Sequence, residues 1–209
     1  MAATVTTKRT RRTRSDGERT RRKILETAVR LATVEGLDGL SIGNLAMATE
    51  VSKSGLYAHF GSKEELQLET IEVARDLFID VVVIPALGVE GRGRAIGLCD
   101  SFLDYIHRRT LPGGCFFAAV AAEQGARPGP VRTRVAEIQL EWMNLLVESV
   151  SKAVEAGELS SDTDVELLAF ELNAVVVAAN TAFNLHDNPA VIDRARAAVE
   201  RIVSSLVPS

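Results

Sequence analysis

The side chains best suited to recognition chemistry gather between residues 41 and 63, in the segment SIGNLAMATEVSKSGLYAHFGSK. They are small hydroxyls, an aromatic hydroxyl, an imidazole and two ammonium groups: Ser41, Ser52, Lys53, Ser54, Tyr57, His59 and Lys63. Groups of this kind hydrogen-bond to phosphates and to base edges. Gly55 stands among them, and its missing side chain allows a partner surface to come close. The chemistry that this set indicates is noncovalent binding to a groove of double-stranded DNA.

Patterns for other chemistry are weak along the chain. The three histidines fall in different segments, no Ser or Cys lies in a nucleophile motif, and no glycine-rich phosphate loop occurs. The two cysteines, Cys99 and Cys115, cannot build a disulfide framework, and no Cys/His spacing fits zinc. The pair Glu64-Glu65 suits a helix start, where acidic residues favour the dipole. We therefore expect no catalytic residues, no metal and no cofactor.

The elements that must position the polar set form a helix-turn-helix pattern. Ser41 can cap a first short helix and Ser52 a second, since serine accepts a hydrogen bond from backbone amides at a helix start. Val51 and Leu56 have the spacing of a hydrophobic staple, which fixes the angle of the second helix. Ser62 and Glu65 have capping-box spacing and predict a third helix. Periodicity alone fits a pair of ordinary core helices equally well.

The segment VSKSGLYAHFGSKEEL resembles the signature of the TetR family of bacterial transcription regulators, and the resemblance extends from about Ile24 to Leu68. It implies an all-α fold of about nine helices: an N-terminal three-helix helix-turn-helix domain and a C-terminal helical domain for ligand binding and dimerisation. It also implies a homodimer on an approximately palindromic operator and a small-molecule effector. One departure is Glu50, where the family usually has Gly, because a left-handed turn residue with a side chain costs about 1 kcal/mol.

Charge is distributed unevenly along the chain. Residues 1–65 contain 12 Lys and Arg against 8 Asp and Glu, a net charge of +4, and the remaining residues have a net charge of −8. The basic end is the expected nucleic-acid end. The chain is 46% hydrophobic with only 5% aromatic residues, which favours a core of packed aliphatic helices.

Four segments follow from these patterns. Residues 1–15 are Arg- and Thr-rich without periodicity and predict a basic disordered arm, which could follow phosphates or merely aid solubility. Residues 16–62 form the expected DNA-binding domain, its first helix opening at Ser15 or Asp16. A connecting helix runs from residue 62 to about residue 84, before Pro85. Residues 63–209 form the expected ligand-binding and dimerisation domain.

Candidate ligand contacts lie on the C-terminal helices that would surround a cavity. They are large or polarisable side chains with one amide among them: Phe102, Tyr105, Cys115, Phe116, Trp142, Met143, Asn180 and Phe183. Each could equally be plain core, and Cys115 could be either an inert buried thiol or a sensor. The last two helices, beginning near Asp162 and at Asn188-Pro189, are the expected dimer surface, as two helices from each subunit of a four-helix bundle.

The N-terminus lacks the apolar run of a secretion signal, and the longest uncharged stretch, Leu172 to His186, contains several amides. We expect a cytoplasmic protein with no membrane-spanning segment. Three function classes remain open: a ligand-responsive DNA-binding regulator, usually a repressor; a DNA-binding regulator or activator without an effector; and a helical enzyme or carrier. A solid C-terminal core would favour the second class, and turnover would favour the third.

Overall fold

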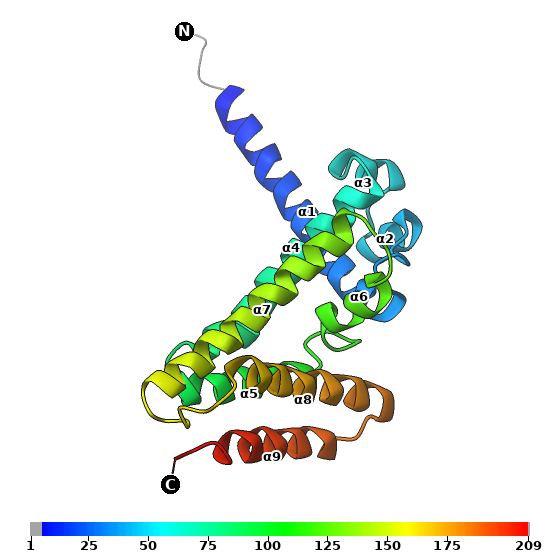
Figure 1. The fold of residues 1–209 in the computed structure, drawn as a ribbon. Coiled ribbons are helices and arrows are strands. Elements are labelled where there is room, and N and C mark those ends of the chain that lie inside the picture. The colour runs from blue at the N-terminus through cyan, green and yellow to red at the C-terminus, as the bar shows by residue number, and fades with distance from the viewer. Residues whose placement is uncertain (1–5, 209) are drawn as a thin grey trace.

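A computed structural model of the chain describes residues 6–208, with side chains from residue 17 onward. In this part of the chain there are nine α-helices and no strands: α1 (Thr6–Glu35), α2 (Ile42–Thr49), α3 (Lys53–His59), α4 (Lys63–Phe78), α5 (Gly91–His107), α6 (Phe116–Gln124), α7 (Pro130–Glu155), α8 (Val165–His186) and α9 (Ala190–Ser204). Figure 1 shows a head of α1, α2 and α3 above a larger body of α5 to α9, in which α7 runs alongside α4 and α6 lies next to the head. The expected all-α, two-part fold is confirmed.

The predicted serine caps all form in the head. The hydroxyls of Ser41, Ser52 and Ser62 accept from backbone N–H groups three residues later, at 2.9, 3.1 and 3.0 Å. Each hydrogen bond satisfies an amide that the helix itself leaves unpaired. The inward faces of these short helices supply Leu45, Leu56 and Phe60 to one core, each at most 1% exposed. Local chemistry therefore sets the three helix starts.

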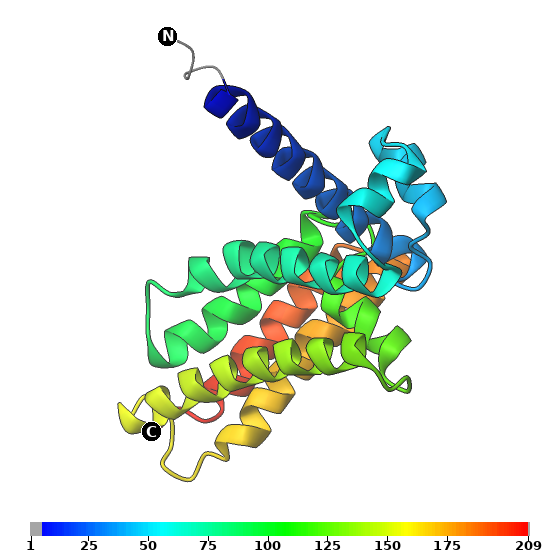
Figure 2. The ribbon, with the colours of Figure 1, turned by 90° about the horizontal axis from the view of Figure 1, so that it is seen from above.

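The N-terminal segment differs from the expected disordered arm. Helix α1 begins at Thr6 and continues without interruption to Glu35, so Ser15 does not start a helix. Arginine and lysine are good helix formers, and no proline occurs between residues 6 and 35 to stop the helix. Figure 2 shows the first half of α1 extending away from the body. Residues 1–5 of the expected arm lie outside the described part.

The connecting helix also ends differently from its sequence pattern. The regular α-helix stops at Phe78, a π-helical turn follows at Ile79–Val83, and a 3₁₀ turn at Ile84–Ala86 closes the segment. Pro85 lies in that last turn and has no N–H to continue an α-helical ladder. The π-helical turn and the 3₁₀ turn both pack against α5.

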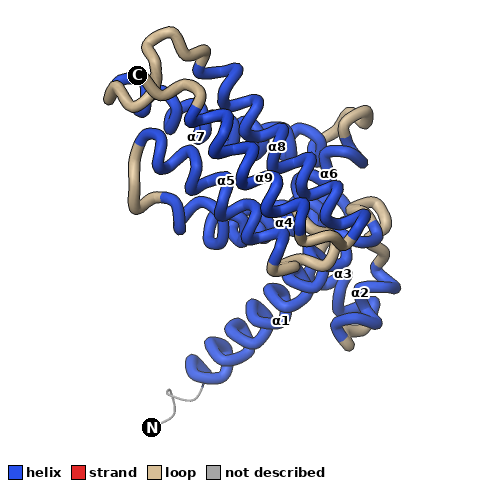
Figure 3. Tube along the Cα trace, turned by 90° about the horizontal axis from the view of Figure 1, so that it is seen from below, coloured by secondary structure: helices blue, strands red, loops and turns tan. Residues whose placement is uncertain are grey.

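The body is a bundle in which α5 contacts α7, α8 and α9, and α8 and α9 pack against each other at one side. The tube view in Figure 3 shows these long helices running beside one another with short loops at their ends. Phe78 of α4 enters the bundle, and its ring lies 5.4 Å from Trp142, 5.9 Å from Phe117 and 6.0 Å from Phe102, each edge to face. Aromatic rings prefer this geometry. The end of α4 is thus part of the core of the body.

The head is fastened to the body by polar contacts around the loop between α1 and α2. The carboxylate of Glu123, on α6, accepts from the backbone N–H groups of Leu37 at 2.7 Å and Asp38 at 2.8 Å. From α4, the Gln67 amide donates to the Leu37 carbonyl at 3.1 Å. A further contact is steric: a Cβ on Gly113 would lie 1.8 Å from the Thr33 carbonyl oxygen, so only glycine fits there. The loop between α1 and α2 is therefore hydrogen-bonded to both α4 and α6.

Among the described helices, α8 has the length and apolar character of a candidate membrane span, a composition that core helices share. In this fold α8 packs against α5, α7 and α9 along one side. Its opposite side stays exposed and apolar, with Leu167 52%, Phe170 63% and Leu185 75% accessible.

Candidate nucleic-acid interface and internal cavity

Helix α3 presents the polar side chains that the sequence singled out. Lys53, Ser54 and Tyr57 are exposed, Tyr57 by 60%, while Leu56 on the opposite side is completely buried. His59 is half-buried near the Phe60 ring. The tertiary structure therefore brings Lys53, Ser54 and Tyr57 to one accessible helix whose inner side is held by the core.

Ser41 and Ser52 have a structural role at this surface. Both hydroxyls act as helix caps, and the Ser52 oxygen also lies 3.1 Å from the Ser54 oxygen. They remain exposed and can still approach a partner. Met47 of α2 is 76% exposed on this part of the molecule. It was not among the predicted residues, because an apolar side chain in a short helix is expected to be buried in the core.

Glu50 in the turn and Gly55 in α3 each have a physical explanation. Glu50 ends α2 in the left-handed conformation, with φ of 59°, as the comparison with the family glycine predicted. Gly55 has a structural reason in addition to the expected approach of a partner. A Cβ at this position would meet Val51 Cγ1 at 3.0 Å and the Ser52 hydroxyl at 3.2 Å, so the close packing of the turn itself favours glycine.

Two of the cations counted as positive surface are tied into the fold. Arg21 donates to the His59 carbonyl at 2.8 Å, pairs with Glu69 of α4, and stacks 4.9 Å over the Phe60 ring. It therefore clamps α1, α3 and α4 together. Lys63, at the start of α4, donates to the Asp38 carbonyl at 2.5 Å but stays exposed. Arg21 could not be told from a free surface cation, since its partners lie 38 and 48 residues away in sequence.

The body contains a largely apolar cavity of about 350 Å³ between α4, α5, α6, α7 and α8. Its walls combine aromatic and aliphatic side chains with a few polar groups: Arg75, Phe78, Ile79, Val83, Phe102, Cys115, Phe117, Ala118, Ala121, Ile138, Gln139, Glu141, Trp142, Leu145, Asn173 and Val177. The Trp142 indole N–H donates to the side-chain oxygen Oδ1 of Asn173 at 2.9 Å. This cavity is of a size that takes small organic molecules.

Three of the eight predicted ligand contacts, Phe102, Cys115 and Trp142, line this cavity. The other five, Tyr105, Phe116, Met143, Asn180 and Phe183, do not. Tyr105 and Phe116 are buried in the aromatic core, Met143 packs against that core, and Phe183 contacts His107. The Asn180 side-chain oxygen accepts from the Cys115 N–H at 2.9 Å, so this amide holds the start of α6 to α8.

Both cysteines are buried free thiols. Loss of solvation raises the pKa of Cys99 to about 12 and that of Cys115 to about 11. Among the described residues, no group of three or more His, Cys, Asp or Glu side chains could hold a metal ion.

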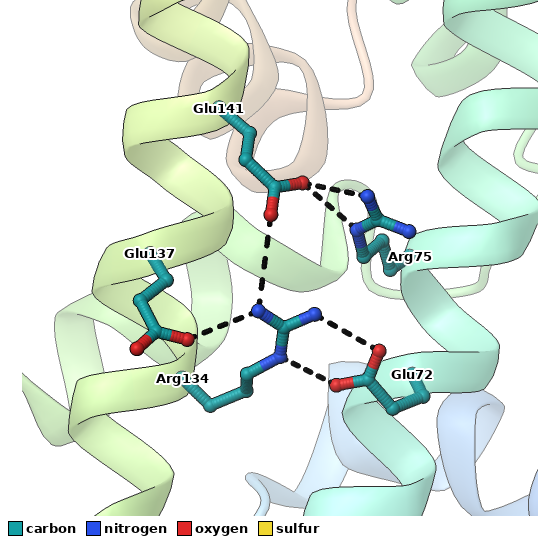
Figure 4. Close-up of polar contacts among 5 residues, drawn as sticks. All are labelled: Glu72, Arg75, Arg134, Glu137 and Glu141. Carbon is teal, nitrogen blue, oxygen red and sulfur yellow. Dashed lines mark hydrogen bonds and ion pairs between the residues drawn. The ribbon is translucent and has the colours of Figure 1, made fainter.

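An ionic network joins α4 to α7 beside the cavity (Figure 4). The Arg134 guanidinium binds both oxygens of Glu72, at 2.5 and 3.0 Å, and one oxygen of Glu137 at 3.0 Å. These bonds with Arg134 lower the pKa of Glu72. Arg75 of α4 donates through Nε and Nη2 to one oxygen of Glu141 on α7, at 2.9 and 2.8 Å. The network was not predicted, because its two halves are more than 60 residues apart in sequence.

Comparison with known families agrees with this geometry. Residues 24–70 match the model described as bacterial regulatory proteins, tetR family, and residues 91–199 match the model of the tetracyclin repressor-like C-terminal domain. The chain belongs to the TetR family. It is a DNA-binding transcriptional regulator, and its relatives are regulators rather than enzymes.

Individual TetR-family members resemble the chain over most of its length. The regulator SrpR of Pseudomonas putida is 24% identical over 157 residues, which cover 75% of this chain and 71% of SrpR. A TetR regulator from Chloroflexus aurantiacus has a TM-score of 0.86 at 25% identity, covering 92% of this chain and 98% of its own. A cysteine mutant of CifR, solved with 26-base-pair operator DNA, has a TM-score of 0.74 at 25% identity over 88% of this chain and 95% of its own.

Proposed function

We propose that this TetR-family regulator is a repressor that binds an approximately palindromic operator as a homodimer and leaves it when a small molecule fills the cavity. The cavity is the observation that supports this proposal. Two of its walls are α4, through Phe78, and α6, through Ala118 and Ala121. These are the same helices that hold the head, through Gln67 and Glu123.

The DNA contacts belong to the expected DNA-binding domain, residues 16–62, and to the start of α4. Lys53 and Ser54 on the exposed side of α3 suit base edges, and Tyr57 and Lys63 suit phosphates. Ser41, Ser52, Gly55 and His59 shape or flank that surface. The operator complex of CifR supports the expectation that a protein of this fold binds duplex DNA. A regulator with this role acts in the cytoplasm, where the chromosome is.

Binding of the effector changes DNA affinity only by preferring one spacing of the two heads. A 100-fold loss of DNA affinity needs about 2.7 kcal/mol of such preference. One buried aromatic side chain that differs in packing between the two states supplies about that much. The difference in binding free energy that the cavity must supply is therefore modest. By reciprocity, bound operator must weaken the affinity for the effector by the same 100-fold.

The test begins with selection of bound duplexes from a random pool, followed by titration of the selected operator. We expect Lys53→Ala to change base preference and Lys63→Ala to weaken all duplexes alike, lowering the salt slope by about one unit. Lys152→Ala, on α7 of the body, serves as the matched control and should leave the slope unchanged. Absence of any sequence preference at low and high salt would refute the proposal.

The effector arm of the test uses a binder found by thermal-shift screening. Its affinity is measured with and without operator. Identical affinities in the two titrations would show that this molecule does not release the protein from DNA.

A further inference from the structure

The cavity has a charged pair in largely apolar walls. Its only charged lining residues among those described are Arg75 of α4 and Glu141 of α7, which face each other in Figure 4. Both side chains are partly exposed, Arg75 by 31% and Glu141 by 47%. A ligand in the cavity can therefore reach an ion pair without leaving its apolar surroundings.

The network at this end has more negative than positive groups. Three carboxylates, those of Glu72, Glu137 and Glu141, share the two guanidiniums of Arg75 and Arg134, which leaves a net charge of −1. Placing one more cation beside the network would balance it, whereas an anion would add to the excess. Coulomb attraction at such a partly shielded site is stronger than in bulk water.

Glu141 is the carboxylate of this network that lines the cavity, and one of its oxygens accepts no hydrogen bond from the network. Arg75 occupies only Oε2, through both of its contacts at 2.9 and 2.8 Å. The nearest guanidinium to Oε1 is that of Arg134 at 3.8 Å, beyond hydrogen-bond distance. Arg134 itself is already bound by Glu72 and Glu137. A ligand N–H can therefore bond to Oε1 while the Arg75 pair stays in place.

Aromatic side chains form much of the wall of the same cavity. Phe78, Phe102, Phe117 and Trp142 all line the space, and Trp142 follows Glu141 directly in α7. The faces of such rings attract cations, and their apolar area holds a hydrophobic body. A cation placed among these rings without a carboxylate would be poorly solvated, so Glu141 is the group that makes its entry favourable.

We propose that the cavity selects small organic cations with an aromatic body, whose ammonium group binds Glu141 at the α4–α7 ionic network. This inference rests on the proposed function, because it names the chemical class of the effector for the same cavity. Glu141 is the recognition residue, and the aromatic rings hold the remainder of the molecule.

The test compares three probes that share one body and differ in charge: 1-naphthylmethylamine, 1-naphthylmethanol and 1-naphthoate. Calorimetric titration of the full-length protein should give the amine at least about a tenfold advantage over the alcohol, equal to about 1.4 kcal/mol, with the naphthoate weakest. Glu141→Gln should remove the advantage of the amine and leave binding of the alcohol unchanged. Glu155→Gln, the same charge change at the far end of α7, should preserve it.

Several results would overturn the inference: equal affinities for amine and alcohol, preference for the naphthoate, no binding of any probe at millimolar concentration, or an amine advantage that survives in Glu141→Gln. Operator binding is measured in the same samples. Release from DNA by all three probes alike would leave the proposed function standing and refute the charge selectivity. Amine binding that depends on Glu141 but leaves DNA affinity unchanged would support the charge selectivity and refute the proposed function.

Discussion

At the scale of single residues, the turn of the helix-turn-helix carries a measurable cost. Glu50 holds a left-handed φ of 59° at the end of α2, a conformation that glycine adopts without the steric cost of a side chain. Nothing in its surroundings requires a carboxylate, since the residue is exposed. The position is therefore a source of strain that a single substitution can relieve.

We expect Glu50→Gly to stabilise the protein by about 0.5–1 kcal/mol, because relief of the strain exceeds the added flexibility of the unfolded chain. Thermal and denaturant unfolding measure the change. Glu64→Gly is the matched control, since Glu64 lies in the first turn of α4 and the same substitution should destabilise a helix there. Loss of stability in both variants would contradict the explanation.

The two cysteine thiols are the second feature at the scale of single residues. Cys99 is fully buried and Cys115 is 3% exposed, and the pKa of each is raised, to about 12 and about 11 respectively. Thiolate is the reactive form, so almost none is present near neutral pH.

We therefore expect neither cysteine to react with a chromogenic disulfide reagent at pH 8 in the folded protein, although Cys115 lines the cavity. Both should react at once after unfolding in guanidinium chloride, which provides the control. Rapid labelling of native Cys115 would instead indicate an accessible thiolate and a sensor role.

At the scale of elements, the joint between head and body depends on α6 as much as on α4. Glu123 accepts from two backbone N–H groups that have no helical partner in the loop after α1. Ala118 and Ala121, less than two turns earlier on α6, line the cavity. One helix thus contacts both the expected effector and the head.

We expect Glu123→Ala to destabilise the protein by about 1–3 kcal/mol, since two amides lose their acceptor. Glu123→Gln should cost less, because an amide oxygen can still accept. A titration of effector with and without operator should show weaker coupling in the alanine variant, with Glu64→Ala as an exposed control. Full coupling in Glu123→Ala would mean that α4 alone connects cavity and head.

At the scale of the whole molecule, the exposed side of α8 has the apolar character of a protein interface. Leu167, Phe170 and Leu185 stand at helical spacing with Ala174, Ala178 and Thr181 between them, and all six are exposed. The inward residues Val176 and Ala195 are 0% and 6% exposed, so substitutions there would disturb the fold of the protomer itself. A second copy of the chain is the occupant that the family architecture indicates.

We expect Phe170→Asp to weaken a homodimer at least about 100-fold, because a symmetric interface loses two buried rings, each contributing about 1.5–3 kcal/mol. Analytical ultracentrifugation measures the association, and operator binding should fall with it. Leu140→Asp alters an equally exposed residue on α7 and serves as the control. A wild-type chain that is monomeric at micromolar concentration and still binds operator tightly would rule the dimer out.

Sequence by itself determined what depends on neighbours along the chain. The caps at Ser41, Ser52 and Ser62 and the buried Leu56 follow from spacing within about four residues, and the left-handed Glu50 was expected from the family's glycine at that position. Helical periodicity also showed that Phe102 and Trp142 point inward. It misplaced the start of α1, since a basic, non-periodic segment can still be helical.

Only the tertiary structure decided which inward residues border empty space. Tyr105 and Phe116 point inward like Phe102, yet neighbouring rings fill their surroundings, whereas Phe78 lines the cavity because α4 enters the body there. Arg75 and Glu141 become partners across 66 residues of sequence, and Arg21 meets Glu69 across 48. Such pairs arise from the packing of whole helices, and a local pattern holds no information about the distance between two elements.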